Sequence, residues 1–128
     1  MSSSVDEAVS FCKQLSEMPE EKAAGREYRL PTESEWEYAY RAGSKTRYCL
    51  GDSEESLGQY AWFGGNAKFY NPVGAKKGNK WGLHDMPGNI SEWCQDGYWN
   101  YPSGAVTDPL GGHYEEPWAS ASGRLLRI

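Results

Sequence analysis

The amino-acid sequence predicts one loop-rich α+β domain over residues 1–128, built around an aromatic core. Its 15 glycines and 7 prolines favour many turns and little long regular structure. Only 38% of the residues are hydrophobic, but six Trp, nine Tyr and three Phe supply large apolar side chains. Each of these rings can bury about 150–250 Å². We expect two helices and a few short strands.

Two capping boxes mark the expected helix starts. Ser4 and Glu7 form the first, in which each side chain can satisfy a backbone donor of the first turn. Apolar residues then recur at helical spacing, which predicts an amphipathic helix over residues 5–17. A second box begins at Thr32 and opens another helix, and Gly43 is expected to end that helix as its left-handed residue.

The other segments predict connections and short strands. The polar stretch 19–27 is expected to be a surface connection, and 28–30 is a short β-prone run that Pro31 ends. Residues 44–80 lack a sustained periodicity, which is typical of loops held by aromatic side chains. Residues 123–128 resemble a strand that is only beginning. We therefore expect the chain to be the middle of a larger domain.

The charge and hydropathy of the chain argue against nucleic acid and membrane as partners. The net charge of −5 and the pI of about 5.0 argue against nucleic acid, because phosphate binding needs a basic surface. The lysines at 76, 77 and 80 are interpreted as a solvated loop. No apolar stretch approaches the length of a membrane span, and serines follow Met1 in place of a basic and then apolar leader. We expect a soluble chain with no membrane partner, and we assign it no compartment.

The three cysteines are Cys12, Cys49 and Cys94, an odd number at wide spacing. This is not the pattern of a disulfide framework, and no C-x-x-C or His–Cys spacing indicates zinc. We interpret all three as reduced packing residues, with a redox role for Cys49 or Cys94 as the alternative.

The segment from Asp85 to Glu92 is the candidate metal site. Pro87 and Gly88 predict a tight turn in which the glycine takes a positive φ. Such a reversal can bring two carboxylates and the carbonyls near Gly88 and Ile90 to one point. Calcium prefers six to eight oxygens of this kind. The alternative without a metal is that Asp85 caps the turn and Glu92 accepts backbone hydrogen bonds. Both interpretations stay open on spacing alone.

Two long motifs carry a resemblance to a known family. RLPTESEWEYA (residues 29–39) and GLHDMPGNISEWCQD (residues 82–96), with GRLLR near the end, resemble the formylglycine-generating enzyme, or sulfatase-modifying factor, family. The resemblance runs from Val5 to Arg127, and the chain is expected to be truncated at both ends relative to the family. It implies a C-type-lectin-like α+β fold, with two helices packed on short antiparallel strands.

The resemblance also implies the site residues. By position, Asp85, Gly88, Ile90 and Glu92 would bind a structural calcium ion. A second calcium site of the family is expected to be absent, because Trp62 follows the Tyr60–Ala61 pair.

The family enzyme oxidises a sulfatase cysteine with oxygen and a copper ion held by two cysteines. Those cysteines lie beyond the position where this chain ends, so we expect no catalytic residue and no copper site within it. His84 and His113 are isolated and are not expected to be catalytic.

Two functions compete on this basis. The first is a sulfatase-modifying-factor domain that, in its complete form, oxidises a cysteine of a protein or peptide substrate to formylglycine; this chain alone is expected to be inactive. The alternative is a non-catalytic C-type-lectin-like binding or scaffold module, and self-association of the fragment is possible in either case. An iron-dependent sulfoxide synthase ranks last, because no histidine triad is present among the two histidines.

Overall fold

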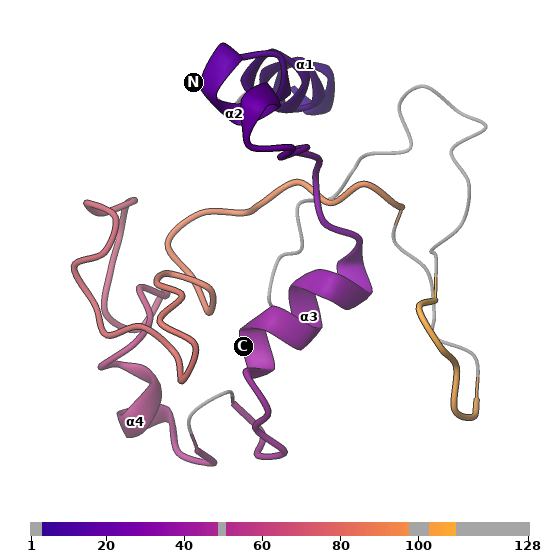
Figure 1. The fold of residues 1–128 in the computed structure, drawn as a ribbon. Helices are drawn as coiled ribbons and strands as arrows, with labels where there is room; N and C mark the ends of the chain where they lie inside the picture. Colours follow the sequence, from indigo (N-terminus) through magenta and orange to yellow (C-terminus); the bar gives the residue numbers. More distant parts are fainter. Residues whose placement is uncertain (1–3, 49–50, 98–102, 110–128) are drawn as a thin grey trace. The chain divides into compact units, whose positions relative to one another are not determined.

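The computed structural model describes residues 4–48, 51–97 and 103–109 (Figure 1). Contacts divide them into two units: residues 4–33 with 93–97 and 103–109, and residues 34–48 with 51–92. The helices are α1 (Val5–Ser16), α2 (Pro19–Ala23), α3 (Glu33–Arg41) and α4 (Glu54–Leu57). None of the helices in these ranges is long and apolar enough to cross a membrane.

Helix α1 confirms the first predicted helix. Its capping box is complete: Glu7 N donates to Ser4 Oγ at 3.2 Å, and Ser4 N donates to Glu7 Oε2 at 2.8 Å. The helix ends at Ser16, one residue before the predicted end. The helix contains no buried residue, and Val9 on its apolar side is 52% exposed.

Helix α2 corrects the prediction of a plain surface connection over residues 19–27. It lies beside α1 (Figure 1). Pro19 at the start of the helix has the φ that a helix requires. The negative charges of Glu20 and Glu21 in the first turn interact favourably with the positive end of the helix dipole. The charged run therefore forms a short helix before Gly25, which has a φ of +64°.

The predicted strand at 28–30 is wrong. This segment is irregular, and its backbone is paired by a side chain: Tyr28 N donates to Ser16 Oγ at 2.8 Å. In the part of the chain that the structure describes, strand-type pairing is limited to an isolated bridge between Tyr48 and Gly51. The predicted strand at 123–128 lies outside the described residues. The helices of the predicted α+β fold are thus observed, and its short strands stay a prediction.

Helix α3 confirms the second predicted helix and carries two buried aromatic residues. Trp36 and Tyr40 stack at 5.5 Å between ring centroids. The helix ends at Arg41 and is followed by Ala42 at φ +45° and by the expected Gly43 at φ +81°. Farther along, buried Tyr48, Leu57 and Ala61 form a small cluster with Phe63 packed against it. Aromatic rings therefore make up much of the described core.

Buried Asn79 links the C-terminal end of α3 to the turn at residues 79–83. Its Nδ2 donates to Ala39 O at 2.7 Å and to Tyr40 O at 3.2 Å, which are carbonyls near the C-terminus of the helix. Its Oδ1 accepts from Trp81 N at 3.0 Å and Leu83 N at 3.1 Å. One side chain thus pairs four backbone groups that would otherwise lose hydrogen bonds.

We predict that Asn79→Asp destabilises the protein by about 3 kcal/mol, because both donated bonds are lost and a negative charge faces a helix C-terminus. Urea unfolding measures this change. The control Asn66→Asp alters an exposed side chain that bonds to Ala61 O and Phe63 N, and it should cost less than half as much. Equal stability of the Asn79→Asp variant and the unmodified protein would contradict the role of Asn79.

Glu17 and Lys22 form an exposed ion pair between the end of α1 and α2, with Lys22 Nζ 2.6 Å from Glu17 Oε2. The hydrogen bond from Lys22 lowers the pKa of Glu17 below its ordinary value of 4.5, and the charges of Lys22 and Lys13 add to the effect. A carboxyl group whose pKa is lowered in the folded state stabilises the folded protein at a pH above the ordinary pKa of that group. This stabilisation is lost as the pH falls through the lowered pKa of the folded state.

We predict that an NMR titration of the Glu17 carboxyl gives a midpoint below 4.5. Lys22→Gln should raise the midpoint toward that value, and Lys13→Gln should raise it less, because Lys13 acts only through its charge. A midpoint that does not change in Lys22→Gln would contradict the pairing.

Candidate metal centre

The turn from Asp85 to Glu92 has two non-glycine residues in the left-handed region. Asp85 has a φ of +58° and Asn89 a φ of +74°. Gly88 N donates to Asp85 O at 3.2 Å, and Ile90 N donates to Gly88 O at 3.1 Å. These bonds fold the backbone back twice within six residues. Among residues other than glycine, aspartate and asparagine are enriched in this conformation, which suits the sequence to the turn.

Gly88 is needed for a reason that differs from the predicted one. It is not among the glycines with a positive φ, so the expectation of a left-handed Gly88 is wrong. A Cβ at this position would collide with Trp62 O, which leaves no room for a side chain. Asn89 N also donates to Trp62 O at 2.9 Å. The turn is therefore seated directly on the backbone of Trp62.

Asp85 offers the clearest candidate ligand. Its Oδ2 accepts from Gly74 N at 2.6 Å. Its Oδ1 is buried and has no hydrogen-bond partner. A buried carboxylate oxygen without a partner is costly, and a bound cation removes that cost.

Glu92 lies at the other end of the turn and is exposed. Its Oε2 accepts from the indole Nε1 of Trp36 at 2.5 Å. The hydrogen bond fixes the carboxylate against α3 and connects the two motifs that carry the family resemblance. A carboxylate oxygen has more than one lone pair, so this bond is compatible with a metal.

The donors present fit calcium better than a softer metal. Gly88 O accepts one hydrogen bond, which leaves the second lone pair of that carbonyl for a cation. Ile90 is 61% exposed, so water can reach the turn. Among residues 4–48, 51–97 and 103–109, no three His, Cys, Asp or Glu side chains are grouped to hold a metal ion. The structure places the Asp85 carboxylate against Gly74 N and the Glu92 carboxylate against Trp36 Nε1. A site that used both carboxylates with carbonyls and water would have the oxygen ligands that calcium prefers.

Soft ligands for copper(I) would be cysteine thiolates, and the structure describes two of the three cysteines. Cys12 and Cys94 are both half-buried and neither is in a disulfide, and Cys49 lies outside the described residues. His84 is exposed, with its Nδ1 2.8 Å from Lys76 O. His113 also lies outside.

Sequence reasoning missed Asn89 and Gly74 as parts of the turn's support. Asn89 Oδ1 accepts from Asn71 N at 2.7 Å, and its Nδ2 donates to Asn71 O at 3.0 Å. Gly74 N binds the carboxylate of Asp85. An asparagine beside a Pro-Gly pair is a turn signal, but its partner, which is 18 residues away, could not be identified locally.

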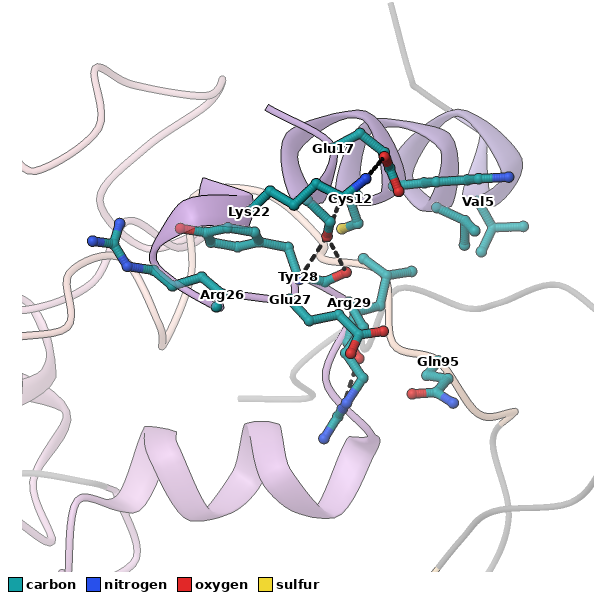
Figure 2. Close-up of a pocket in the computed structure, with 14 residues that line it drawn as sticks. Val5, Cys12, Glu17, Lys22, Arg26, Glu27, Tyr28, Arg29 and Gln95 are labelled. Atoms are coloured by element: carbon teal, nitrogen blue, oxygen red, sulfur yellow. Dashed lines mark hydrogen bonds and ion pairs between the residues drawn. The ribbon is translucent and has the colours of Figure 1, made fainter. Parts of the chain in front are cut away.

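A cavity of about 670 Å³ lies in the first unit, between α1, α2 and residues 25–30 (Figure 2). On its wall, Arg26 Nη1 donates to Glu21 Oε2 at 2.8 Å, and Tyr28 Oη donates to the same oxygen at 2.6 Å. Hydrogen bonding with Tyr28, and then with Glu21, raises the pKa of Arg26. These side chains satisfy one another, so we assign the cavity no ligand.

Comparison with known proteins identifies the fold family. The Sulfatase-modifying factor enzyme 1-like domain matches residues 2–125. The formylglycine-generating enzyme of Mycobacterium tuberculosis is 37% identical over 103 residues, which cover 67% of this chain and 31% of that protein. The chain thus spans about a third of the length of this curated relative.

Two solved structures are also similar. PvdO from Pseudomonas aeruginosa has a TM-score of 0.68 and 28% identity, covering 88% of this chain and 44% of that one. Treponema denticola variable protein 1 has a TM-score of 0.57 and 40% identity, covering 60% of this chain and 28% of that one. Since the family match spans almost the whole sequence, the chain belongs to the family of sulfatase-modifying factor enzyme 1-like domains.

Proposed function

We propose that this chain provides the calcium-binding part of a C-type-lectin-like, sulfatase-modifying-factor domain that oxidises a protein cysteine to formylglycine in its complete form. The family match over residues 2–125 carries the proposal, and the identity with a formylglycine-generating enzyme supports it. The substrate would be a cysteine-containing segment of a sulfatase-like protein.

The proposed ligands of the calcium ion are Asp85, Gly88, Ile90 and Glu92. Bound calcium would supply positive charge to a turn that holds two carboxylates and a buried oxygen without a hydrogen-bond partner. Asp85 would connect the ion to Gly74, and Glu92 would connect it to Trp36 on α3. The role of these residues is to hold irregular backbone in place, and none of them reacts with the substrate thiol.

The oxidation needs thiolate chemistry that the described residues do not offer, so no step of it is assigned to them. Copper belongs to the complete family enzyme in this proposal. What this chain contributes is the turn, its support by α3, and the surface that residues 34–92 present.

A non-catalytic binding or scaffold module is the second candidate. Its support is the similarity to a protein whose name gives no enzyme activity: Treponema denticola variable protein 1 is 40% identical to this chain and covers 60% of it. In that case calcium would still stabilise the turn, and an assay for formylglycine would give no product.

Removal of calcium should lower the melting temperature of the protein. At a hundredfold excess over Kd, a bound ion stabilises the folded state by about 2.7 kcal/mol. Asp85→Asn should abolish the response to EDTA, because the amide keeps an acceptor for Gly74 N and loses the charge. Asp52→Asn is the matched control, since Asp52 accepts from Arg47 N elsewhere and should leave the response intact. Melting curves that EDTA does not shift would refute the calcium assignment.

The oxidase activity is tested with the natural full-length gene product, Cu(I), oxygen and a cysteine-containing sulfatase peptide. With a thiol reductant also added, we expect the peptide thiol carbon to become an aldehyde and its sulfur to leave as hydrogen sulfide, while oxygen is reduced to water and the added thiol is oxidised to its disulfide. Mass spectrometry and trapping with a hydrazide detect the aldehyde. The 128-residue chain alone should give no product. Absence of product from the full-length protein would favour the non-catalytic module.

A further inference from the structure

One stretch of the second unit combines exposed apolar and basic side chains. Phe69, Tyr70 and Val73 are 83%, 79% and 82% exposed. Lys68 and Lys80 are also exposed, and neither forms a hydrogen bond or ion pair within the described residues. We call these five residues the basic apolar surface. Large rings and a branched aliphatic side chain in water, in the same stretch of chain as two cations without a partner in the described residues, are unusual for a solvated loop.

The charge of this region opposes the charge of the rest of the chain. Residues 56–84 contain four lysines and no aspartate or glutamate. The whole chain has a net charge of −5, so the other residues carry −9. A charge of +4 along this stretch of an otherwise acidic chain attracts an acidic partner.

The backbone beneath the surface is held at several points. The two hydrogen bonds between Asn71 and Asn89 and the bond from Gly74 N to Asp85 fix residues 71–74. Lys76 Nζ donates to Gly58 O at 2.6 Å and lies 3.9 Å from the centroid of the Trp62 ring. Asn71 Nδ2 also donates to Phe69 O at 2.9 Å. The backbone at residues 69–74 is therefore pre-organised, which reduces the entropy lost on binding.

We propose that the basic apolar surface docks an acidic polypeptide segment that carries apolar side chains. The apolar side chains of the segment would cover Phe69, Tyr70 and Val73, and its carboxylates would meet Lys68 and Lys80. Charge complementarity favours a short peptide over a polyanion, because nucleic acid or an anionic membrane would also meet the −9 of the rest of the chain. The inference does not depend on calcium or on oxidase activity.

The test uses a fluorescein-labelled peptide of alternating Glu and Leu, titrated with the whole chain and followed by fluorescence anisotropy. We expect saturable binding that weakens as salt is added, because exposed charges are screened. Lys68→Glu with Lys80→Glu should weaken binding by about tenfold. Phe69→Ser with Val73→Ser should also weaken it by about tenfold, through lost apolar contact.

The control is Lys13→Glu with Lys45→Glu, which makes the same change in net charge with two other exposed lysines. It should bind the peptide within about twofold of the unmodified protein, because steering by net charge alone is a weak effect at moderate salt. Circular dichroism verifies that each variant is folded. A loss in the control equal to the loss in the Lys68/Lys80 variant would overturn the proposal.

Three other results would also overturn it. The first is an absence of saturable peptide binding at low salt. The second is preferential binding of phosphatidylserine vesicles or of an oligonucleotide. The third is self-association that the Lys68/Lys80 substitutions abolish while the peptide does not bind, which would make a second copy of the chain the occupant.

Discussion

The structure of residues 58–92 depends on side chains that pair the backbone. Every buried N–H and C=O needs a partner, and this described region has no strands to provide one. Asparagines and an aspartate provide the partners instead. Asn66 pairs residues 61 and 63, Asn79 pairs four backbone groups, Asn89 pairs Asn71, and Asp85 binds Gly74. The candidate metal turn is part of this set of contacts.

The features that the sequence predicted correctly are local ones. Ser4 and Glu7 are three residues apart, and the box that they form needs no tertiary contact. Gly43 likewise ends its helix through its own conformational freedom. The strand predicted at 28–30 failed because its partner is a serine side chain from α1, and helix α2 was missed because a charged run also suits a solvated loop.

The candidate site was only partly predictable for the same reason. The sequence located the turn and its carboxylates. It did not predict that Trp62 O would approach Gly88, or that Trp36 would bind Glu92 across 56 positions. Both contacts depend on the tertiary fold. Gly88 shows the difference well: the residue is required for space and not for a positive φ.

The family assignment and the chemistry of the turn are consistent with a structural role for the described residues in the proposed function. In the proposed function, a sulfatase-modifying-factor domain would need a rigid scaffold as well as thiol chemistry. The described residues provide a turn seated on Trp62 and fixed to α3, with oxygen donors of the type that calcium prefers. The thiol chemistry of the proposal belongs to the complete protein.

Terbium(III) luminescence is the most direct test of the metal turn, because the indole of Trp36 donates to a proposed ligand and can transfer excitation to a bound ion. We expect tryptophan-sensitised emission that saturates with terbium and is lost when calcium displaces the terbium. Asp85→Asn should abolish the emission. No sensitised emission from the folded protein, or emission that persists unchanged in Asp85→Asn, would contradict a cation site in this turn.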